Sequence, residues 1–367
     1  MQKVKMNGLV LNLWYEQRGQ LVRKSIMEKE VTIYDIAKRL NYSPATVSRA
    51  LNDHPAIRSD TKDVITSMAR QMGYRSNTFA SNLRRQRTNT IGVIVPRLNS
   101  NFMSCALAGM EKVANEAGYN LIISQSLESA RKEKANAKTM FDSRVDGLLV
   151  SVAYDTEDIE HFDDFINRGV PLLFFDRVIE HNQCPSIVID NVKAGYEATT
   201  HLLEEGCTRV MHVTGNLKRN VYADRLKGYR MALQDRDIHY EKQLVLETDL
   251  SQEAGIEAAR QLMASPHRPD GLFVTNDLCA VTCMGQLKKA GLSIPTDVAV
   301  VGFNNDPVSQ VVEPNLTTIH YPGREMGEIA VKSLINHLNG LMDMQTTNTI
   351  ILRSELIIRE SSRKKPI

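Results

Sequence analysis

From residue 91 onward, short apolar runs alternate with longer segments that have the apolar periodicity of helices. Unbroken apolar runs of this length are typical of strands in a parallel sheet that is covered on both faces. The runs come in two series, separated near Asp190, which predicts two successive doubly wound α/β halves with a cleft between them. The expected strands are 91–96, 120–126, 147–151 and 171–176 in the first half, and 209–214, 244–247, 271–275 and 299–303 in the second.

A different pattern precedes these halves, in residues 31–74. Thr32 is placed to cap a short helix that has Asp35 in its first turn, where a carboxylate favours the helix dipole. After a short turn, Ser43 is placed to cap a second helix with Pro44 at its first position. Two short helices joined in this way form a helix-turn-helix, whose second helix faces the bases of the major groove.

A third helix and a basic segment complete this N-terminal region. Ser59 is placed to cap the third helix, and Gly73 suits its end. Residues 77–87 are polar, hold few core residues and end in three arginines. Such a segment is too poor in apolar residues to be a stable helix alone, but it could form one against a second copy and DNA.

The charge of the chain is unevenly divided. Residues 1–90 hold 16 Lys/Arg and 7 Asp/Glu, against totals of 45 and 43, so this part carries a net +9 and the remainder −7. A basic end on an acidic body is the asymmetry expected of a DNA-reading domain on a body that does not bind DNA. With 42% hydrophobic and 24% charged residues, the composition is that of a globular protein, not of a membrane protein or a disordered chain.

Five cysteines at irregular spacing argue against a disulfide framework and for a reducing cytoplasm. Cys279 and Cys283 could share one helix face, but two further nearby ligands for zinc are lacking, so we expect core residues there and neither metal nor cofactor. The apolar stretch 8–15 is too short to span a bilayer, and Asn12 interrupts it without a cleavage site following. We expect residues 1–29 to be a poorly ordered extension.

Four motifs in this order resemble the lactose-repressor/galactose-repressor (LacI/GalR) family of bacterial transcription regulators. They are Val-Thr-Ile-Tyr-Asp-Ile-Ala at 31–37, Ser-Pro-Ala-Thr-Val-Ser-Arg-Ala-Leu-Asn at 43–52, Met-Gly-Tyr at 72–74 and Asn-Thr-Phe-Ala-Ser-Asn-Leu-Arg at 77–84. The resemblance extends to about Glu360. It implies an all-α helix-turn-helix head, a hinge helix and a two-lobed α/β effector domain like a periplasmic binding protein, with parallel sheets.

The resemblance also implies domain limits: a head over 30–75, a hinge over 76–90 and an effector domain over 91–360. Lobe 1 is expected over about 91–190 and 321–348, and lobe 2 over about 191–320 and 349–360, with three crossings between them. Residues 361–367 are left as a basic tail without a leucine heptad, which favours a homodimer over a tetramer. Ser76 stands where many relatives have proline, so the hinge entry is expected to be less stiff.

Operator contacts are carried over from the matching motifs. The expected major-groove residues are Thr32, Tyr34, Ser43, Ala45, Thr46, Ser48 and Arg49. In the hinge, the leucine matching Leu83 wedges into the minor groove and bends the duplex. The expected hinge residues are Asn77, Ala80, Leu83 and Arg84.

The residues just past each expected strand are polar, and this is where ligands of open parallel sheets bind. The resemblance carries effector contact onto Asn101, Phe102, Asp176, Arg219, Arg225, Leu250, Asn276 and Asn304. Carboxylates, amides and aromatic faces suit a sugar. Asn304 replaces the aspartate common in the family, and Lys218, Arg219 and Arg225 are expected near one wall. These features lead to the hypothesis that the effector is a sugar or a uronate-type sugar acid.

The sequence thus predicts a cytoplasmic, homodimeric transcription regulator, most simply a repressor, that binds double-stranded operator DNA and is controlled by a small effector. A solute-binding protein would have the same two lobes, but the head and the lack of a signal peptide argue against it. An enzyme acting on sugars is disfavoured, because the chain has no nucleophile-elbow, phosphate-loop or zinc-protease motif.

Overall fold

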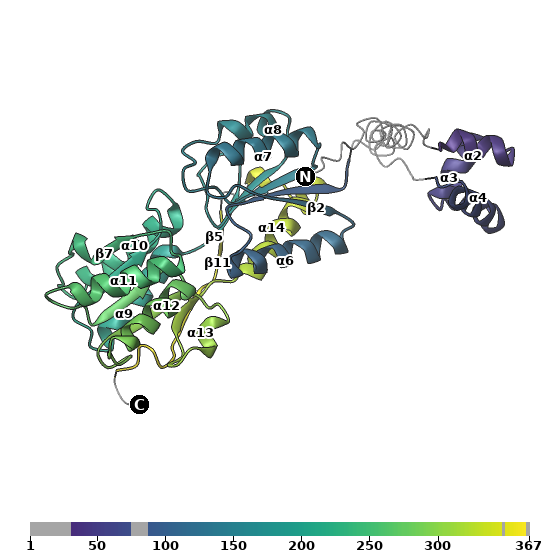
Figure 1. Ribbon diagram of the computed structural model, residues 1–367. Helices are drawn as coiled ribbons and strands as arrows, with labels where there is room; N and C mark the ends of the chain where they lie inside the picture. The colour runs from purple at the N-terminus through teal and green to yellow at the C-terminus, as the bar shows by residue number, and fades with distance from the viewer. Residues whose placement is uncertain (1–30, 75–86, 347–348, 365–367) are drawn as a thin grey trace, which may run out of the picture. The chain divides into compact units, whose positions relative to one another are not determined.

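A computed structural model describes residues 31–74, 87–346 and 349–364 of the chain (Figure 1). The chain divides into two compact units, residues 1–86 and 87–367. Each unit has its own hydrophobic core and is described here by itself. The extension 1–29 and the hinge residues Asn77, Ala80, Leu83 and Arg84 lie outside the described residues.

The described part of the first unit, residues 31–74, is a bundle of three helices, α2 (Ile33–Leu40), α3 (Pro44–Leu51) and α4 (Ser59–Gln71). A small apolar core joins them, with the side chains of Ile36, Val47 and Ile65 fully buried. Short helices of this length depend on such packing for their stability. One cap was predicted wrongly: α4 begins at Ser59 itself and Arg58 occupies the cap position, without a side-chain cap bond.

Lobe 1 of the second unit is a six-stranded sheet with strand order β11-β5-β4-β3-β1-β2, all of whose neighbouring pairs are parallel. Its helices are α6 (Asn101–Glu116), α7 (Ala130–Asp142), α8 (Asp163–Asn167) and α14 (Gly323–Leu338), with the short turn η1 (Glu160–Phe162). Its strands are β1 (Thr90–Val95), β2 (Asn120–Gln125), β3 (Gly147–Val150), β4 (Leu172–Phe175), β5 (Ser186–Ile189) and β11 (Thr349–Leu352).

Lobe 2 repeats this plan with strand order β12-β10-β9-β8-β6-β7, in which only the pairing of β10 with β12 is antiparallel. Its helices are α9 (Asn191–Glu204), α10 (Asn220–Gln234), α11 (Gln252–Ala264), α12 (Asp277–Lys289) and α13 (Val308–Val311). Its strands are β6 (Val210–Thr214), β7 (Val245–Glu247), β8 (Gly271–Val274), β9 (Ala299–Asn304), β10 (Thr317–His320) and β12 (Glu355–Ile357). The turns η2 (Lys242–Leu244) and η3 (Met344–Thr346) complete the two lobes.

The third crossing between the lobes lies later than the sequence led us to expect. β11 pairs in parallel with β5, so Thr349–Leu352 belongs to lobe 1, and the chain enters lobe 2 only between Leu352 and Glu355. Assigning 349–360 to lobe 2 was therefore wrong. Burial along β11 alternates, as on an edge strand, whereas the central strand β3 is buried throughout.

The expected tail also begins too early. Ser361 and Ser362 are fully buried in lobe 2. The Ser361 hydroxyl oxygen accepts the backbone N–H of Thr317 at 2.9 Å, and the Ser362 hydroxyl lies 2.7 Å from Nε2 of His201. Two small hydroxyl residues between charged ones carried no apolar signal, because hydrogen bonds rather than apolar contacts hold this segment.

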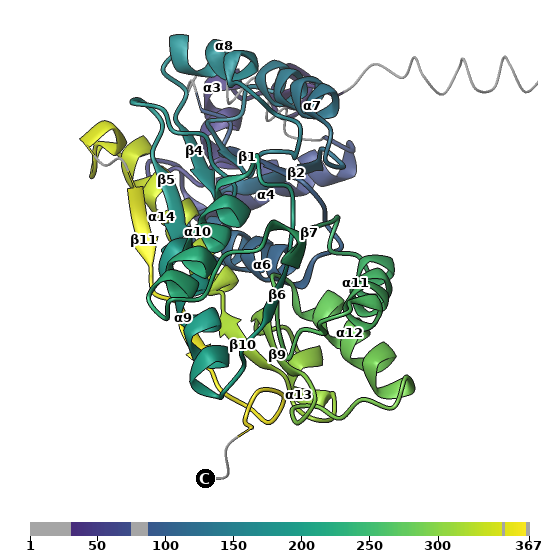
Figure 2. The same ribbon diagram turned by 90° about the vertical axis from the view of Figure 1, so that its left-hand side faces the viewer.

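Close packing of α9 on α10 fixes one wall of the cleft between the lobes, and the two helices lie side by side (Figure 2). A Cβ atom on Gly195 would lie 2.3 Å from the backbone oxygen of Arg225, and one on Gly228 would lie 2.1 Å from the backbone oxygen of Val192. Only glycine allows this approach. The contact therefore fixes the position of the Arg225 backbone relative to α9.

Candidate DNA-binding surface and effector cleft

The start of α2 is capped by two neighbouring polar groups. The Asp35 carboxylate accepts the backbone N–H of Thr32 at 2.8 Å and its hydroxyl at 2.6 Å. A carboxylate in the first turn also interacts favourably with the helix dipole. Thr32 occupies the cap position of α2 and Asp35 lies in its first turn, as the sequence predicted.

The start of α3 is capped as the sequence predicted. The Ser43 hydroxyl oxygen accepts the backbone N–H of Thr46 at 3.1 Å, and Pro44 occupies the first helical position. On the inner side of α3, Val47 and Ala50 are buried against the core. This packing fixes the orientation of α3, so that the side chains on its outer side face away from the core.

The seven predicted major-groove residues are all exposed or half-exposed. Tyr34 is 66% exposed, and Arg49 forms no ion pair with any residue that the structure describes. The small side chains beside Arg49 would let α3 approach base edges, while the guanidinium could reach a guanine or a phosphate. The exposed members are Thr32, Tyr34, Ser43, Ala45 and Arg49, and the half-exposed ones are Thr46 and Ser48.

Removing the α3 cap tests how far this surface depends on local structure. Ser43→Ala should lower the free energy of unfolding of the head by about 1 kcal/mol, because one backbone N–H of the first turn loses its acceptor. Thermal unfolding followed by circular dichroism measures the change. Ser67→Ala, at an exposed position inside α4, is the matched control and should be nearly neutral. Equal effects of both changes would contradict the role of the cap.

In the second unit, residues of both lobes line a cavity of about 530 Å³. This volume is in the range of small-molecule sites. Seven of the eight predicted effector residues line it, namely Asn101, Phe102, Asp176, Arg225, Leu250, Asn276 and Asn304.

Arg225 is buried in the wall that α10 supplies. Its Nε donates to Oδ1 of Asn191 at 2.9 Å, and its guanidinium carbon lies 3.5 Å from the centre of the Phe303 ring. Arg225 forms no ion pair with the described residues, although it is only 3% exposed. Burial lowers the pKa of its guanidinium. A buried cation without a counter-ion favours a ligand that offers acceptors.

Asp176 lies at the end of β4 in lobe 1, where a left-handed backbone (φ 60°) ends the strand. Its carboxylate accepts the Tyr321 hydroxyl at 2.7 Å and the Ser151 hydroxyl at 3.2 Å. Like Arg225, it lines the cavity and forms no ion pair with the residues that the structure describes. Lobe 1 thus supplies a buried acceptor and lobe 2 a buried donor, which suits hydroxyl groups of one ligand.

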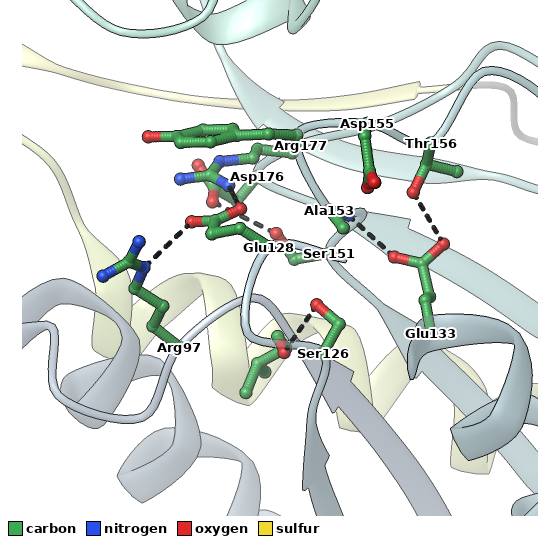
Figure 3. A network of polar contacts seen from close by, with 12 residues as sticks. Arg97, Ser126, Glu128, Glu133, Ser151, Ala153, Asp155, Thr156, Asp176 and Arg177 are labelled. Atoms are coloured by element: carbon green, nitrogen blue, oxygen red, sulfur yellow. Dashed lines mark hydrogen bonds and ion pairs between the residues drawn. The ribbon is translucent and has the colours of Figure 1, made fainter. Parts of the chain in front are cut away.

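Charged and aromatic residues from both lobes complete the cavity wall, and of these the sequence had not marked Arg97, Glu128 and Tyr154. Glu128 accepts from Nη1 of Arg177 at 2.8 Å, and Nε of Arg97 lies 3.4 Å from it (Figure 3). The Arg177 guanidinium carbon lies 4.2 Å from the centre of the Tyr154 ring, and the Tyr154 hydroxyl is 3.2 Å from that of Tyr222. Position after a strand could have suggested Glu128, whereas the tyrosines had no distinguishing signal.

The cation cluster expected near one wall is not formed, and Arg219 does not line the cavity. Arg219 is buried and its Nη2 donates to the backbone oxygen of Thr156 at 2.6 Å, while Lys218 pairs with Glu157 at the surface. Both side chains leave the start of α10 toward lobe 1, away from the side that Arg225 faces. The cavity is instead lined by Arg97, Arg177 and Arg225 and by Glu128, Asp176, Asp249 and Asp306.

The remaining predicted residues have structural partners as well as a place on the cavity. Asn276 caps α12 by accepting the backbone N–H of Cys279 at 3.0 Å. Leu250 and Asn304 have positive φ values of 59° and 115°, which residues other than glycine seldom adopt. Asn101 donates from Nδ2 to Oδ1 of Asp306 at 2.9 Å.

Asp277 gives the cleft region a pH-sensitive group. It is fully buried beside β9 and accepts from the Thr318 hydroxyl and the Asp306 N–H, both at 2.7 Å. Burial raises the pKa of this carboxyl to about 7. Because the folded pKa lies above the unfolded value of 3.8, the folded state holds an extra proton between these values. This group's contribution to stability is therefore greatest at low pH and is lost as pH rises toward 7.

Asp277→Asn isolates this contribution. The free energy of unfolding of the wild type, relative to Asp277→Asn, should fall between pH 5 and 7 by at most roughly 1.4 kcal/mol per pH unit. Urea unfolding at several pH values measures the difference. A constant difference across this interval would show that Asp277 does not titrate there.

Two observations bear on other classes of site. All five cysteines are free, and no group of three or more His, Cys, Asp or Glu that could hold a metal occurs in the described part of the chain. Within residues 31–74, 87–346 and 349–364, no helix is both long and apolar enough to cross a bilayer.

Comparisons with known proteins cover both units. Residues 32–77 match the family model of bacterial regulatory proteins, lacI family, and residues 199–362 match a periplasmic binding protein-like domain. The chain is 31% identical to the catabolite control protein A of Priestia megaterium, over 84% of this chain and 93% of that protein. It is 30% identical to the HTH-type transcriptional repressor CytR of Escherichia coli, over 92% of this chain and 98% of that protein.

Solved structures give the same result. The Lac repressor bound to ONPG in its repressed state has a TM-score of 0.77 at 26% identity, covering 91% of this chain and all of that one. The transcription regulator CcpA of Lactococcus lactis has a TM-score of 0.68 at 25% identity, covering 74% and 98%. The chain therefore belongs to the lacI family of bacterial regulatory proteins and is a DNA-binding transcription regulator rather than an enzyme, as its sequence indicated.

Proposed function

We propose that this protein is a cytoplasmic repressor that binds a near-palindromic operator as a homodimer and is controlled by a sugar or sugar-derived effector. The effector binds in the cavity between lobes 1 and 2. The observation that carries this proposal is the pairing of a buried acceptor, Asp176, with a buried donor, Arg225, from opposite lobes of one cavity. A ligand with several hydroxyl groups can engage both at once and so stabilise one arrangement of the lobes.

The surroundings of this pair support a sugar. Phe102 and Tyr321 stack with ring centres 4.1 Å apart, and Phe102, Tyr154 and Tyr222 offer aromatic surface along the cavity. Amide groups of Asn276 and Asn304 add both donors and acceptors. Polar groups that alternate with aromatic rings suit a ring whose faces are apolar and whose edge carries hydroxyl groups.

The charges favour a neutral sugar over the uronate-type acid that the sequence suggested. Three arginines and four carboxylates line the cavity, and Lys218 and Arg219 do not contribute. Glu128 already pairs with Arg177, which leaves Arg225 as the buried cation without a carboxylate partner among the described residues. Arg225 can donate to the hydroxyl groups of a neutral sugar, whereas the carboxylate of a sugar acid would place a second negative charge near Asp176.

Exposed apolar side chains support the homodimer. Ile122 and Ile123 of β2 are 39% and 40% exposed at the edge of the first sheet. Ile256 and Met263 of α11 and Val311 of α13 are exposed in lobe 2. An edge strand with exposed apolar side chains, such as β2, is a ready site for a protein contact. Two heads held in this way can read two half-sites, while hinge residues including Leu83 act in the central minor groove.

Two measurements test the proposal. Purified protein should select particular genomic fragments over bulk competitor DNA at moderate salt, because base contacts add to the phosphate contacts that any sequence offers. Calorimetry against neutral mono- and disaccharides and the matching uronic acids should find the neutral compounds tighter. A solute-binding protein would bind a sugar without fragment selection, and tighter binding of the acids would reverse the assignment of ligand charge.

A further inference from the structure

Hydrogen bonds between the two lobes gather at two separate places beside the cavity. At the first, the start of α10 meets the loops after β3 and β4: Arg219 donates to Thr156, and Nδ2 of Asn220 donates to the backbone oxygen of Asp176 at 3.2 Å. At the second, the N-terminus of α6 in lobe 1 meets the loop after β9 in lobe 2. Here the described residues supply one side-chain bond, from Nδ2 of Asn101 to Oδ1 of Asp306 at 2.9 Å.

Asp306 is held firmly within lobe 2. Its backbone N–H donates to Oδ2 of Asp277, which is fully buried and also accepts the Thr318 hydroxyl. The preceding residue, Asn305, accepts from Nη2 of Arg359 at 2.7 Å. Asn304 and Asn305 both have positive φ values, 115° and 60°, a conformation that non-glycine residues keep only where surrounding contacts hold it. The Asp306 carboxylate thus has a fixed position relative to lobe 2.

Asn101 has an equally fixed origin in lobe 1, because it is the first residue of α6 and is followed by the buried Phe102. Its side chain is exposed, whereas Asp306 is only 7% exposed. Since both partners are fixed to different lobes, the bond between them can form only when the lobes are close together. Opening the cleft would separate the two groups and hydrate the Asp306 carboxylate.

We infer that the Asn101–Asp306 bond is a clasp between the lobes that stabilises their closed arrangement. Asp277 is the residue that positions its acceptor. The bond lowers the free energy of closing the lobes, which effector binding would otherwise have to supply. It therefore increases effector affinity even if Asn101 does not contact the effector. This inference deepens the proposed function by assigning a conformational role to a residue that the sequence marked as an effector contact.

Hydrogen exchange of the full-length, effector-free protein tests the clasp. Loss of the bond should speed exchange of amides in 99–104 and 304–309 by about tenfold, as expected for a lost hydrogen bond to a charged group. Asn101→Ala and Asp306→Ala should each show this change, and the double variant should show no further change. Asp306→Asn, which keeps an acceptor oxygen, should retain most of the protection and excludes misfolding as the cause.

Asn115→Ala is the matched control, because Asn115 is an exposed asparagine of the same helix, α6, and does not line the cavity. It should exchange like the wild type. Wild-type exchange in Asn101→Ala and Asp306→Ala, or additive changes in the double variant, would overturn the clasp. If the sugar panel finds no ligand, the proposed effector fails, while this ligand-free exchange result still decides whether the clasp exists.

Discussion

Arg225→Ala is expected to abolish the response to effector while operator binding persists. The variant loses the Nε donor that lies 2.9 Å from Oδ1 of Asn191, the stacking of the guanidinium on Phe303 and the buried positive charge. It leaves Asp176 without the opposing donor across the cavity. Effector affinity should fall on the order of 100-fold or more, since several contacts to a buried charged group are lost together. Calorimetry with the tightest-binding sugar, and operator binding with and without it, give the two readouts.

Two variants sharpen this test. Arg225→Lys keeps the charge but cannot both stack on Phe303 and donate in the fork geometry, so it should also lose the response. Arg230 lies on the same helix, over the Tyr240 ring and outside the cavity, so Arg230→Ala should respond to effector as the wild type does. If Arg225→Ala responds to effector as the wild type does, the effector binds elsewhere.

Arg49→Ala is expected to give the largest loss of operator specificity. Arg49 is exposed on α3 and forms no ion pair with the described residues, so its guanidinium is available to a guanine. Loss of a bidentate base contact costs about 1 to 3 kcal/mol, or roughly 5- to 150-fold in operator affinity. Affinity for random DNA should fall far less, because phosphate contacts elsewhere remain.

Gel-shift titrations on operator and random duplex at one salt concentration measure both affinities. Arg70→Ala, an exposed arginine near the end of α4, is the matched control and should change operator affinity little. Equal losses on operator and random DNA by Arg49→Ala would reassign Arg49 to a phosphate.

The sequence predicted those features that arise from local patterns. Ser43 and Thr32 lie at helix starts whose chemistry is contained within four residues. Both occupy the cap positions, and the Ser43 side chain makes the expected cap bond. Central strands such as β3 are buried on both faces and therefore show as continuous apolar runs. The edge strand β11 has alternating burial, and its partner β5 is far away in the chain, so its lobe was assigned wrongly.

Cavity residues were predicted correctly where a sequence motif determines which way a side chain points. They were predicted less well where packing determines it. Arg225 and Arg219 lie six residues apart at one helix start, yet the first faces the cavity and the second faces Thr156. Spacing alone does not separate these outcomes. Glu128 and Tyr154 follow strands, and Tyr222 lies on α10. Their places at the cavity depend on contacts with Arg177, which spacing along the chain does not predict.

The central claim is that the cavity and the DNA-binding head are energetically coupled, and thermodynamic linkage tests it most directly. Operator affinity is measured with and without saturating effector, and effector affinity is measured with and without saturating operator DNA. The two ratios must be the same factor, and we predict a factor of at least about fivefold, the lower end of allosteric coupling. Ratios of one in both experiments would contradict the account, because the cavity would then bind its ligand without controlling the operator.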